Sequence, residues 1–206
     1  MAPLVLVLTD IVRFPEPARS LEPLCGLAPP GSIGIIVRDR ELREVDWLRL
    51  AEQVRTLTER THQFLIIADR AQHLTRLAAD GVHLGADCGS ASAVRRVHPE
   101  LRWLSRAWHG YAELPQFEKD ALDAVLVSPV FAARKGRAPI GLGRFGELTR
   151  ELAPRAAYAL GGAGRAELHS VREVGAQGVA MIEAAHVEPP ESLAEAIRVC
   201  LSAENG

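Results

Sequence analysis

Residues 32–68 read SIGIIVRDRELREVDWLRLAEQVRTLTERTHQFLIIA, and this stretch places a short apolar run on either side of a longer amphipathic segment. The runs at 32–37 and 64–68 are apolar at nearly every position, which is typical of parallel strands that are covered on both faces. Between residues 45 and 60 the apolar side chains recur every three or four positions, as on the buried face of a helix. The stretch therefore predicts a strand, a helix and a second strand.

The same alternation continues along the rest of the chain. Further short apolar runs occur at 4–9, 81–84, 102–105, 124–127, 157–160 and 178–182. Segments with helical spacing occur at 71–79, 91–97, 143–152, 165–174 and 191–201. About eight such units predict an α/β fold, a single (β/α)8 TIM barrel, with a doubly wound open sheet as the alternative. Since no Pro-, Gly- and Ser-rich linker interrupts the pattern, we expect one domain over residues 1–206.

Net charge, the length of the first apolar run and the cysteine spacing exclude several classes of protein. A formal net charge of -2 offers no general attraction to nucleic acid or to an anionic membrane surface, so neither partner is expected. The first apolar run is too short for a signal or membrane segment. Cys25, Cys88 and Cys200 are scattered, which argues against a disulfide framework or a structural zinc site. These features favour a reducing, cytoplasmic location.

Charged and polar residues follow almost every predicted strand. In a barrel of this kind the loops after the strands converge at the C-terminal mouth, where reactive groups are found. The residues in question are Asp10, Arg38, Asp39, Arg40, Asp69, Arg70, Asp87, Arg106, His109, Ser128, Arg134, Lys135, Arg137 and Glu183. A ring of such groups must be solvated, paired or used for binding, because unpaired burial would be costly.

The turn ALGGAGR at 159–165 enters a predicted helix after the seventh strand. It lacks the third glycine of a dinucleotide fingerprint, and no Gly-Lys-Ser/Thr follows it, so both nucleotide motifs are excluded. Two interpretations remain for Gly161 and Gly162. They form part of the phosphate site that barrels build after strands seven and eight, or they are packing glycines at a tight turn.

Several segments in order together resemble the thiamine phosphate synthase/TenI family, whose members are single (β/α)8 barrels. They are VLVLTD (5–10), IIVRDR (35–40), LIIADR (65–70), DGVHLG (80–85), SPVFAARKG (128–136), YALGGA (158–163) and GAQGVAMIEA (175–184). The chain is closer to the TenI branch at two points. Arg38-Asp39-Arg40 stands where TenI proteins have Arg-Glu-Arg, and Arg106 with His109 matches their R-x-x-H.

The TenI resemblance implies a thiazole tautomerase that needs no cofactor and acts on a small-molecule thiazole phosphate. His109 would move the proton that converts a thiazole carboxylate phosphate into its aromatic isomer, a task that imidazole performs near neutral pH. The residues implied to bind the substrate are Arg38, Arg40, Arg106 and Lys135, with Gly161 and Gly162 at its phosphate. The alternative for the arginines is salt bridging to nearby aspartates. The resemblance also allows a homodimer.

The synthase branch is the alternative enzyme. It joins a pyrimidine pyrophosphate to a thiazole phosphate with Mg²⁺, and here Asp69 and Asp87 would be the metal ligands. The family's second acidic ligand falls on Cys88, and a thiol is a poor ligand for Mg²⁺. A third alternative is a catalytically degenerate member that binds a ligand or partner as a regulator.

We also predict the surroundings of His83 and Glu183. His83 is expected to form a hydrogen bond within the barrel mouth. Glu183 stands where the family usually has a small residue that contacts the phosphate, and an unscreened carboxylate there would repel a phosphate dianion by an amount on the order of a few kcal/mol. Glu183 therefore turns toward Arg165 or another cation, or the ligand carries no phosphate at this point.

Overall fold

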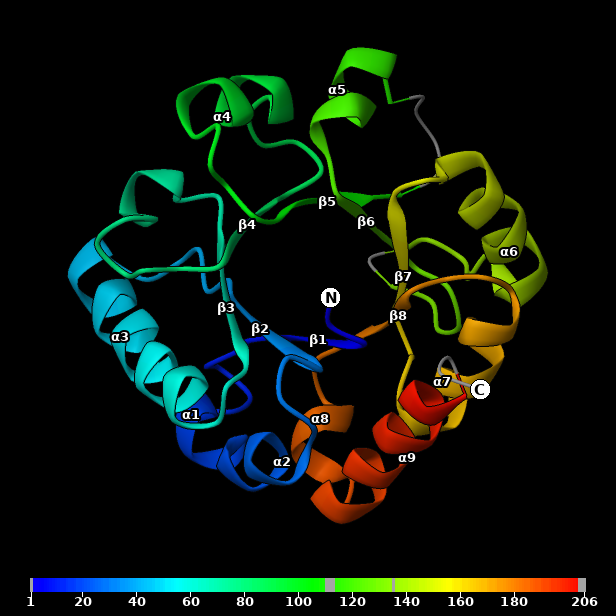
Figure 1. The fold of residues 1–206 in the computed structure, drawn as a ribbon, viewed down its shortest axis with the longest axis horizontal. Coiled ribbons are helices and arrows are strands. Elements are labelled where there is room, and N and C mark those ends of the chain that lie inside the picture. The colour runs from blue at the N-terminus through cyan, green and yellow to red at the C-terminus, as the bar shows by residue number, and fades with distance from the viewer. Residues whose placement is uncertain (1, 110–113, 135, 204–206) are drawn as a thin grey trace.

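The chain forms a closed parallel barrel surrounded by helices (Figure 1). This computed structural model describes residues 2–109, 114–134 and 136–203. Its strands pair in sequence order, and the first closes on the last through the register Val5↔Val179. The strands are β1 Val5–Leu8, β2 Ile33–Val37, β3 Phe64–Ala68, β4 Gly81–Leu84, β5 Leu104–Trp108, β6 Ala124–Val127, β7 Ala156–Leu160 and β8 Gly178–Met181. The predicted (β/α)8 barrel is confirmed, and the open-sheet alternative is wrong.

Helices follow the strands and pack outside the barrel. They are α1 Pro17–Ser20, α2 Glu22–Leu27, α3 Glu44–Arg60, α4 Ala91–Val97, α5 Gln116–Ala121, α6 Gly141–Leu152, α7 Arg165–Glu173, α8 Ala184–Val187 and α9 Pro190–Ser202. The helix expected at 71–79 is shortened to a 3-10 turn at Ala71–His73, and Ala78 adopts a positive φ of 45° before β4 begins. A left-handed residue ends a helix, so this connection is a series of turns.

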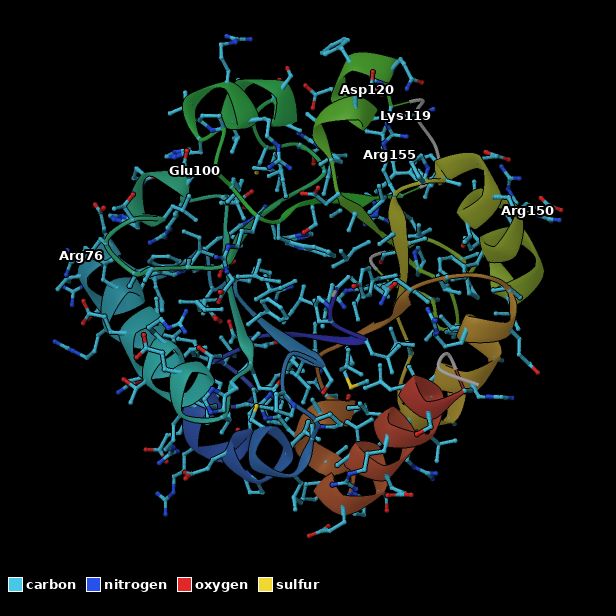
Figure 2. All side chains as sticks on the ribbon, in the orientation of Figure 1. Arg76, Glu100, Lys119, Asp120, Arg150 and Arg155 are labelled. Carbon is cyan, nitrogen blue, oxygen red and sulfur yellow. The ribbon has the colours of Figure 1, made fainter. Side chains whose placement is uncertain are left out.

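The apolar side chains form two layers, which explains why the strands are apolar at every position. Inside the barrel lie alternate residues such as Leu6 and Leu8, whereas Val5 and Val7 face the helices. Trp103 and Tyr158 meet edge to face inside the barrel, with ring centroids 6.0 Å apart. Charged side chains such as Arg76, Glu100 and Arg150 lie around the outer ring of helices (Figure 2). Among the described residues, no helix is long and apolar enough to span a membrane.

Candidate functional site

The end of β2 is fixed to the end of β1 by Asp39. This carboxylate is buried and accepts hydrogen bonds from the Thr9 hydroxyl and from the Ile11 amide, the latter at 2.9 Å. Asp39 therefore has a structural role. The flanking Arg38 is half-buried, and no carboxylate among the described residues forms an ion pair with it.

Arg40 forms an ion pair with Asp69, as expected from the alternative in which the arginines pair with nearby aspartates. Its Nη2 lies 2.5 Å from Asp69 Oδ2, and Asp69 Oδ1 accepts a hydrogen bond from the Gly85 amide at 2.7 Å. The guanidinium packs directly against Gly85, where any Cβ would lie 1.8 Å from Nη2. Asp69 itself has a φ of +59°, so its backbone is strained to bring the carboxylate into this position.

These residues do not fit a magnesium site. The Asp69 carboxylate is engaged by Arg40 and Gly85, and Asp87 is exposed. The group beside Asp69 is the Cys88 thiol, whose pKa is raised by burial and by the Asp69 charge. Within the described ranges, no group of three His, Cys, Asp or Glu side chains could hold a metal ion. Since Mg²⁺ requires several hard oxygen ligands, the donor set expected at Asp69 and Asp87 is not formed.

Arg106 holds the loop after β4. Its buried guanidinium donates hydrogen bonds to the carbonyl oxygens of Gly85 at 3.3 Å, Ala86 at 3.2 Å and Gly89 at 2.6 Å. It also contacts the buried Glu118 carboxylate at 3.4 Å. The two Nη groups of Arg106 are therefore directed at the protein, whereas its buried Nε has no partner among the described residues, and substrate binding by Arg106 stays a prediction.

His83 is buried in the barrel wall, where Nδ1 and the Ser105 hydroxyl are 2.9 Å apart. The expected hydrogen bond is thus confirmed. Burial lowers the pKa of His83 to about 4, and the positive charges of Arg40 and Arg106 act in the same direction while Asp69 opposes them. The ring is therefore neutral near pH 7 and does not carry a positive charge to the mouth.

We expect His83 to make the fold sensitive to acid. Its pKa in the folded protein, about 4, lies below the ordinary value of 6.5, so the unfolded chain binds the proton first. Neutral His83 makes its full contribution to the free energy of unfolding above pH 6.5. As the pH decreases toward 4, the free energy of unfolding falls by up to about 3 kcal/mol. Urea unfolding at several pH values should show a shallower acid slope for His83→Asn than for wild type. Equal slopes would contradict this assignment, and His169→Asn on the exposed face of α7 is the control.

His109 follows β5 directly and is half-buried. Its Nδ1 lies 3.0 Å from the carbonyl oxygen of Ser128, at the end of β6. A carbonyl only accepts hydrogen bonds, so Nδ1 carries a proton, and a neutral ring in this tautomer has its lone pair at Nε2. The contact fixes the tautomer and orientation that a general base needs.

The glycine turn after β7 packs closely on the loop after β6. Gly161 and Gly162 have φ values of +97° and +75°, and the Gly161 carbonyl accepts hydrogen bonds from the amides of Phe131 and Ala132. A Cβ on Gly162 would lie 2.5 Å from the Ala132 Cβ. Both glycines therefore pack closely at a tight turn, and phosphate binding by them stays a prediction. Lys135, expected to bind substrate in the same loop, lies outside the described residues.

Gly162→Ala should lower the free energy of unfolding by about 1–3 kcal/mol, because the new methyl group adds a steric clash to backbone strain. Gly141→Ala is the matched control, since Gly141 has a φ of +76° but no atom within 4 Å of a built Cβ. Urea denaturation of both variants separates the two costs. Equal losses would show that the contact with Ala132 is unimportant.

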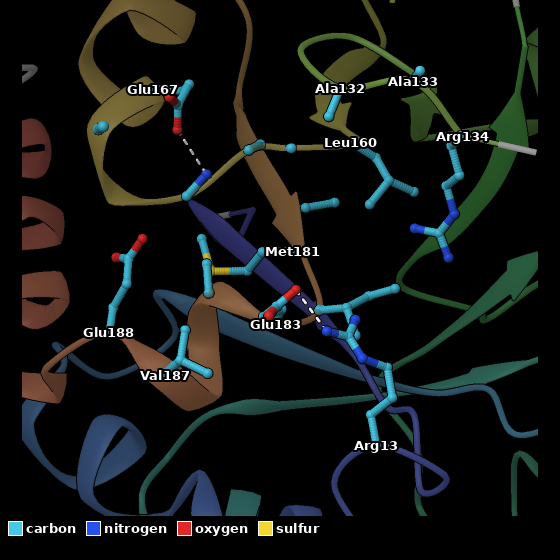
Figure 3. Close-up of a pocket in the computed structure, with 18 residues that line it drawn as sticks. Arg13, Ala132, Ala133, Arg134, Leu160, Glu167, Met181, Glu183, Val187 and Glu188 are labelled. Atoms are coloured by element: carbon cyan, nitrogen blue, oxygen red, sulfur yellow. Dashed lines mark hydrogen bonds and ion pairs between the residues drawn. The ribbon is translucent and has the colours of Figure 1, made fainter. Parts of the chain in front are cut away.

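A cavity of about 550 Å³ opens beside this turn (Figure 3). Leu160 and Met181 supply apolar surface, and the charged residues that line the cavity are Arg13, Arg134, Glu167, Glu183 and Glu188. Glu183 forms an ion pair with Arg13, with Oε2 and Nη2 2.6 Å apart, so it turns to a cation other than Arg165. The sequence did not single out Arg13 or Arg134 for binding; Arg134 was visible only as a cation in the loop after the sixth strand.

The first amides of α7 are occupied by carboxylates of the protein itself. The Gly164 amide donates to Glu167 Oε2 at 2.9 Å. The Arg165 amide lies 3.4 and 3.3 Å from the two carboxylate oxygens of Glu188. These side chains complement the positive end of the helix dipole, so an incoming anion finds fewer free donors there.

Comparisons of the sequence with known proteins indicate one family. A family model described as thiamine monophosphate synthase matches residues 17–185. The putative thiamine-phosphate synthase 2 of Aquifex aeolicus is 29% identical over 182 residues, covering 87% of this chain and 96% of the relative. The thiamine-phosphate synthase of Gloeobacter violaceus is 31% identical over 150 residues, covering 72% of this chain but 44% of the relative.

Among solved structures, the thiamine phosphate pyrophosphorylase from Pyrococcus furiosus matches with a TM-score of 0.80 and 23% identity. The match covers 98% of this chain and 97% of that chain. At this level of identity the likeness shows the shared barrel fold.

Proposed function

We propose a function from the premise that the chain belongs to the thiamine monophosphate synthase family. Membership places it in thiamine biosynthesis, and the proposed role is an enzyme that acts on a phosphorylated thiazole at the C-terminal mouth of the barrel. The specific reaction that its residues favour is tautomerisation of a thiazole carboxylate phosphate. The observation that carries this proposal is the anchored imidazole of His109, 3.0 Å from the Ser128 carbonyl.

The chemistry requires one proton to leave the substrate and to return at another atom. His109 Nε2 accepts this proton, and the resulting imidazolium then donates it, so the ring ends as it began. The Ser128 carbonyl holds Nδ1–H in both states and keeps the ring orientation constant. Because the product thiazole is aromatic, the equilibrium favours it, and the protein has only to position the base and bind an anionic substrate.

Synthase activity is the second candidate, and the comparisons favour it over the tautomerase. The relatives with 29% and 31% identity are named thiamine-phosphate synthases, one of them as putative. Against it stands the site at Asp69, which carries an arginine and a thiol in place of further oxygen ligands.

One paired assay separates these reactions. Purified protein is mixed with the unstable thiazole tautomer, and the rise in thiazole absorbance is followed against the uncatalysed rate. In parallel, both synthase substrates are supplied with Mg²⁺, and thiamine phosphate is measured by chromatography. We expect catalysis in the first assay; product only in the second would establish the synthase, and inactivity in both would leave the degenerate alternative.

A further inference from the structure

We propose that Arg13 and Arg134 clamp the phosphate group of the ligand in the cavity after β7 and β8, and that Glu183 stands in for this anion until the ligand binds. The proposal rests on the proposed function, since it takes a phosphate monoester as the ligand. It assigns phosphate recognition mainly to side-chain cations.

Few backbone amides near the cavity are free to donate hydrogen bonds to a phosphate. Those of Gly164 and Arg165 are bonded to Glu167 and Glu188. The amides of the glycine turn line one wall of the cavity, but a dianion also needs compensating charge. Arginine supplies this charge together with a planar set of N–H donors that suits phosphate oxygens.

Arg134 is the cation best placed to meet this need. It comes from the loop after β6, lines the cavity and forms no ion pair with any carboxylate in the described part of the chain. Burial lowers its pKa, and so do the charges of Arg38, Arg13 and Arg137, with Asp10 opposing them. Several guanidinium groups thus repel one another here, and a bound anion would relieve this repulsion.

Arg13 approaches the same cavity from the loop after β1, and Figure 3 shows its guanidinium beside Glu183. The side chains of Arg13 and Glu183 are 48% and 58% exposed, and such solvated ion pairs contribute little stability. A phosphate dianion carries more charge than a carboxylate, so it competes effectively for Arg13. When Glu183 is displaced, its carboxylate moves away from the phosphate, and the repulsion between the two negative charges decreases.

Calorimetry with inorganic phosphate tests the clamp without any turnover. Arg134→Gln and Arg13→Gln are each expected to weaken phosphate binding by about tenfold or more, the loss of one charge-assisted contact. Glu183→Gln should tighten binding by about three- to tenfold, because it frees Arg13. This gain should shrink in the double variant with Arg13→Gln. Arg49→Gln, an exposed change of equal charge on α3, should leave affinity unchanged.

The proposal is overturned if wild type binds no phosphate at millimolar concentrations, if Arg134→Gln binds as well as wild type, or if Glu183→Gln fails to bind more tightly. Arginine-dependent binding in a protein that is inactive in the tautomerase assay would retain the clamp and reject the reaction. Tautomerase activity unaffected by either arginine substitution, with unchanged phosphate affinity, would retain the reaction and reject the clamp.

Discussion

Replacement of His109 by Asn is expected to lower kcat for thiazole tautomerisation by about 10²- to 10⁴-fold, with a much smaller change in KM. Asn places an N–H near the position of the imidazole Nδ1, so the contact with the Ser128 carbonyl can be kept. It has no group at Nε2 that can accept and return a proton. The variant therefore removes the base while disturbing the loop as little as possible. Single-turnover absorbance kinetics measure the effect on the chemical step.

The matched control is His169→Asn, on the exposed face of α7, where His169 pairs with Glu173. This variant should keep wild-type kcat and KM. A His109→Asn enzyme with wild-type kcat would exclude the proposed proton transfer. An increase in KM alone would instead indicate that His109 binds the substrate.

Replacement of Arg106 by Gln is expected to lower the free energy of unfolding by about 3–5 kcal/mol, the usual cost of leaving a buried charge without its partner. Glu118 would lose its cationic neighbour, and the carbonyls of Gly85, Ala86 and Gly89 would lose their donor. Urea denaturation followed by circular dichroism measures the loss.

Arg144→Gln provides the comparison for this prediction. Arg144 is also an ion-paired arginine, with Glu147 and Glu151 as its partners, but all three side chains are about half exposed. Its loss should cost less than about 1 kcal/mol. If Arg106→Gln unfolded like wild type and only raised KM, Arg106 would not hold the loop after β4 in place and would instead be a substrate ligand.

The barrel could be predicted from the sequence because its strands are buried on both faces, and this pattern is visible in short apolar runs. The turns between β3 and β4 could not, since the left-handed Ala78 leaves no mark in the apolar spacing. β5 spans 104–108 in place of the expected 102–105, and Trp103 just ahead of it packs inside the barrel.

The site was predicted less completely, for a physical reason. Position after a strand indicates that a side chain reaches the mouth, but not which neighbour it contacts. Arg40 follows β2 and Arg106 lies within β5, yet Arg40 pairs with Asp69 and Arg106 binds loop carbonyls. The roles of Arg13 and Arg134 depend on how two distant loops approach each other, which spacing along the chain does not encode.

The pairing of β1 with β8 also limits when the barrel can close during synthesis on the ribosome. Val5 is synthesised long before its partner Val179. Until Gly178–Met181 emerges, β1 has an apolar edge with unpaired backbone groups. Such edges invite pairing with other nascent chains. Chaperone protection during synthesis would therefore matter most before β8 is released.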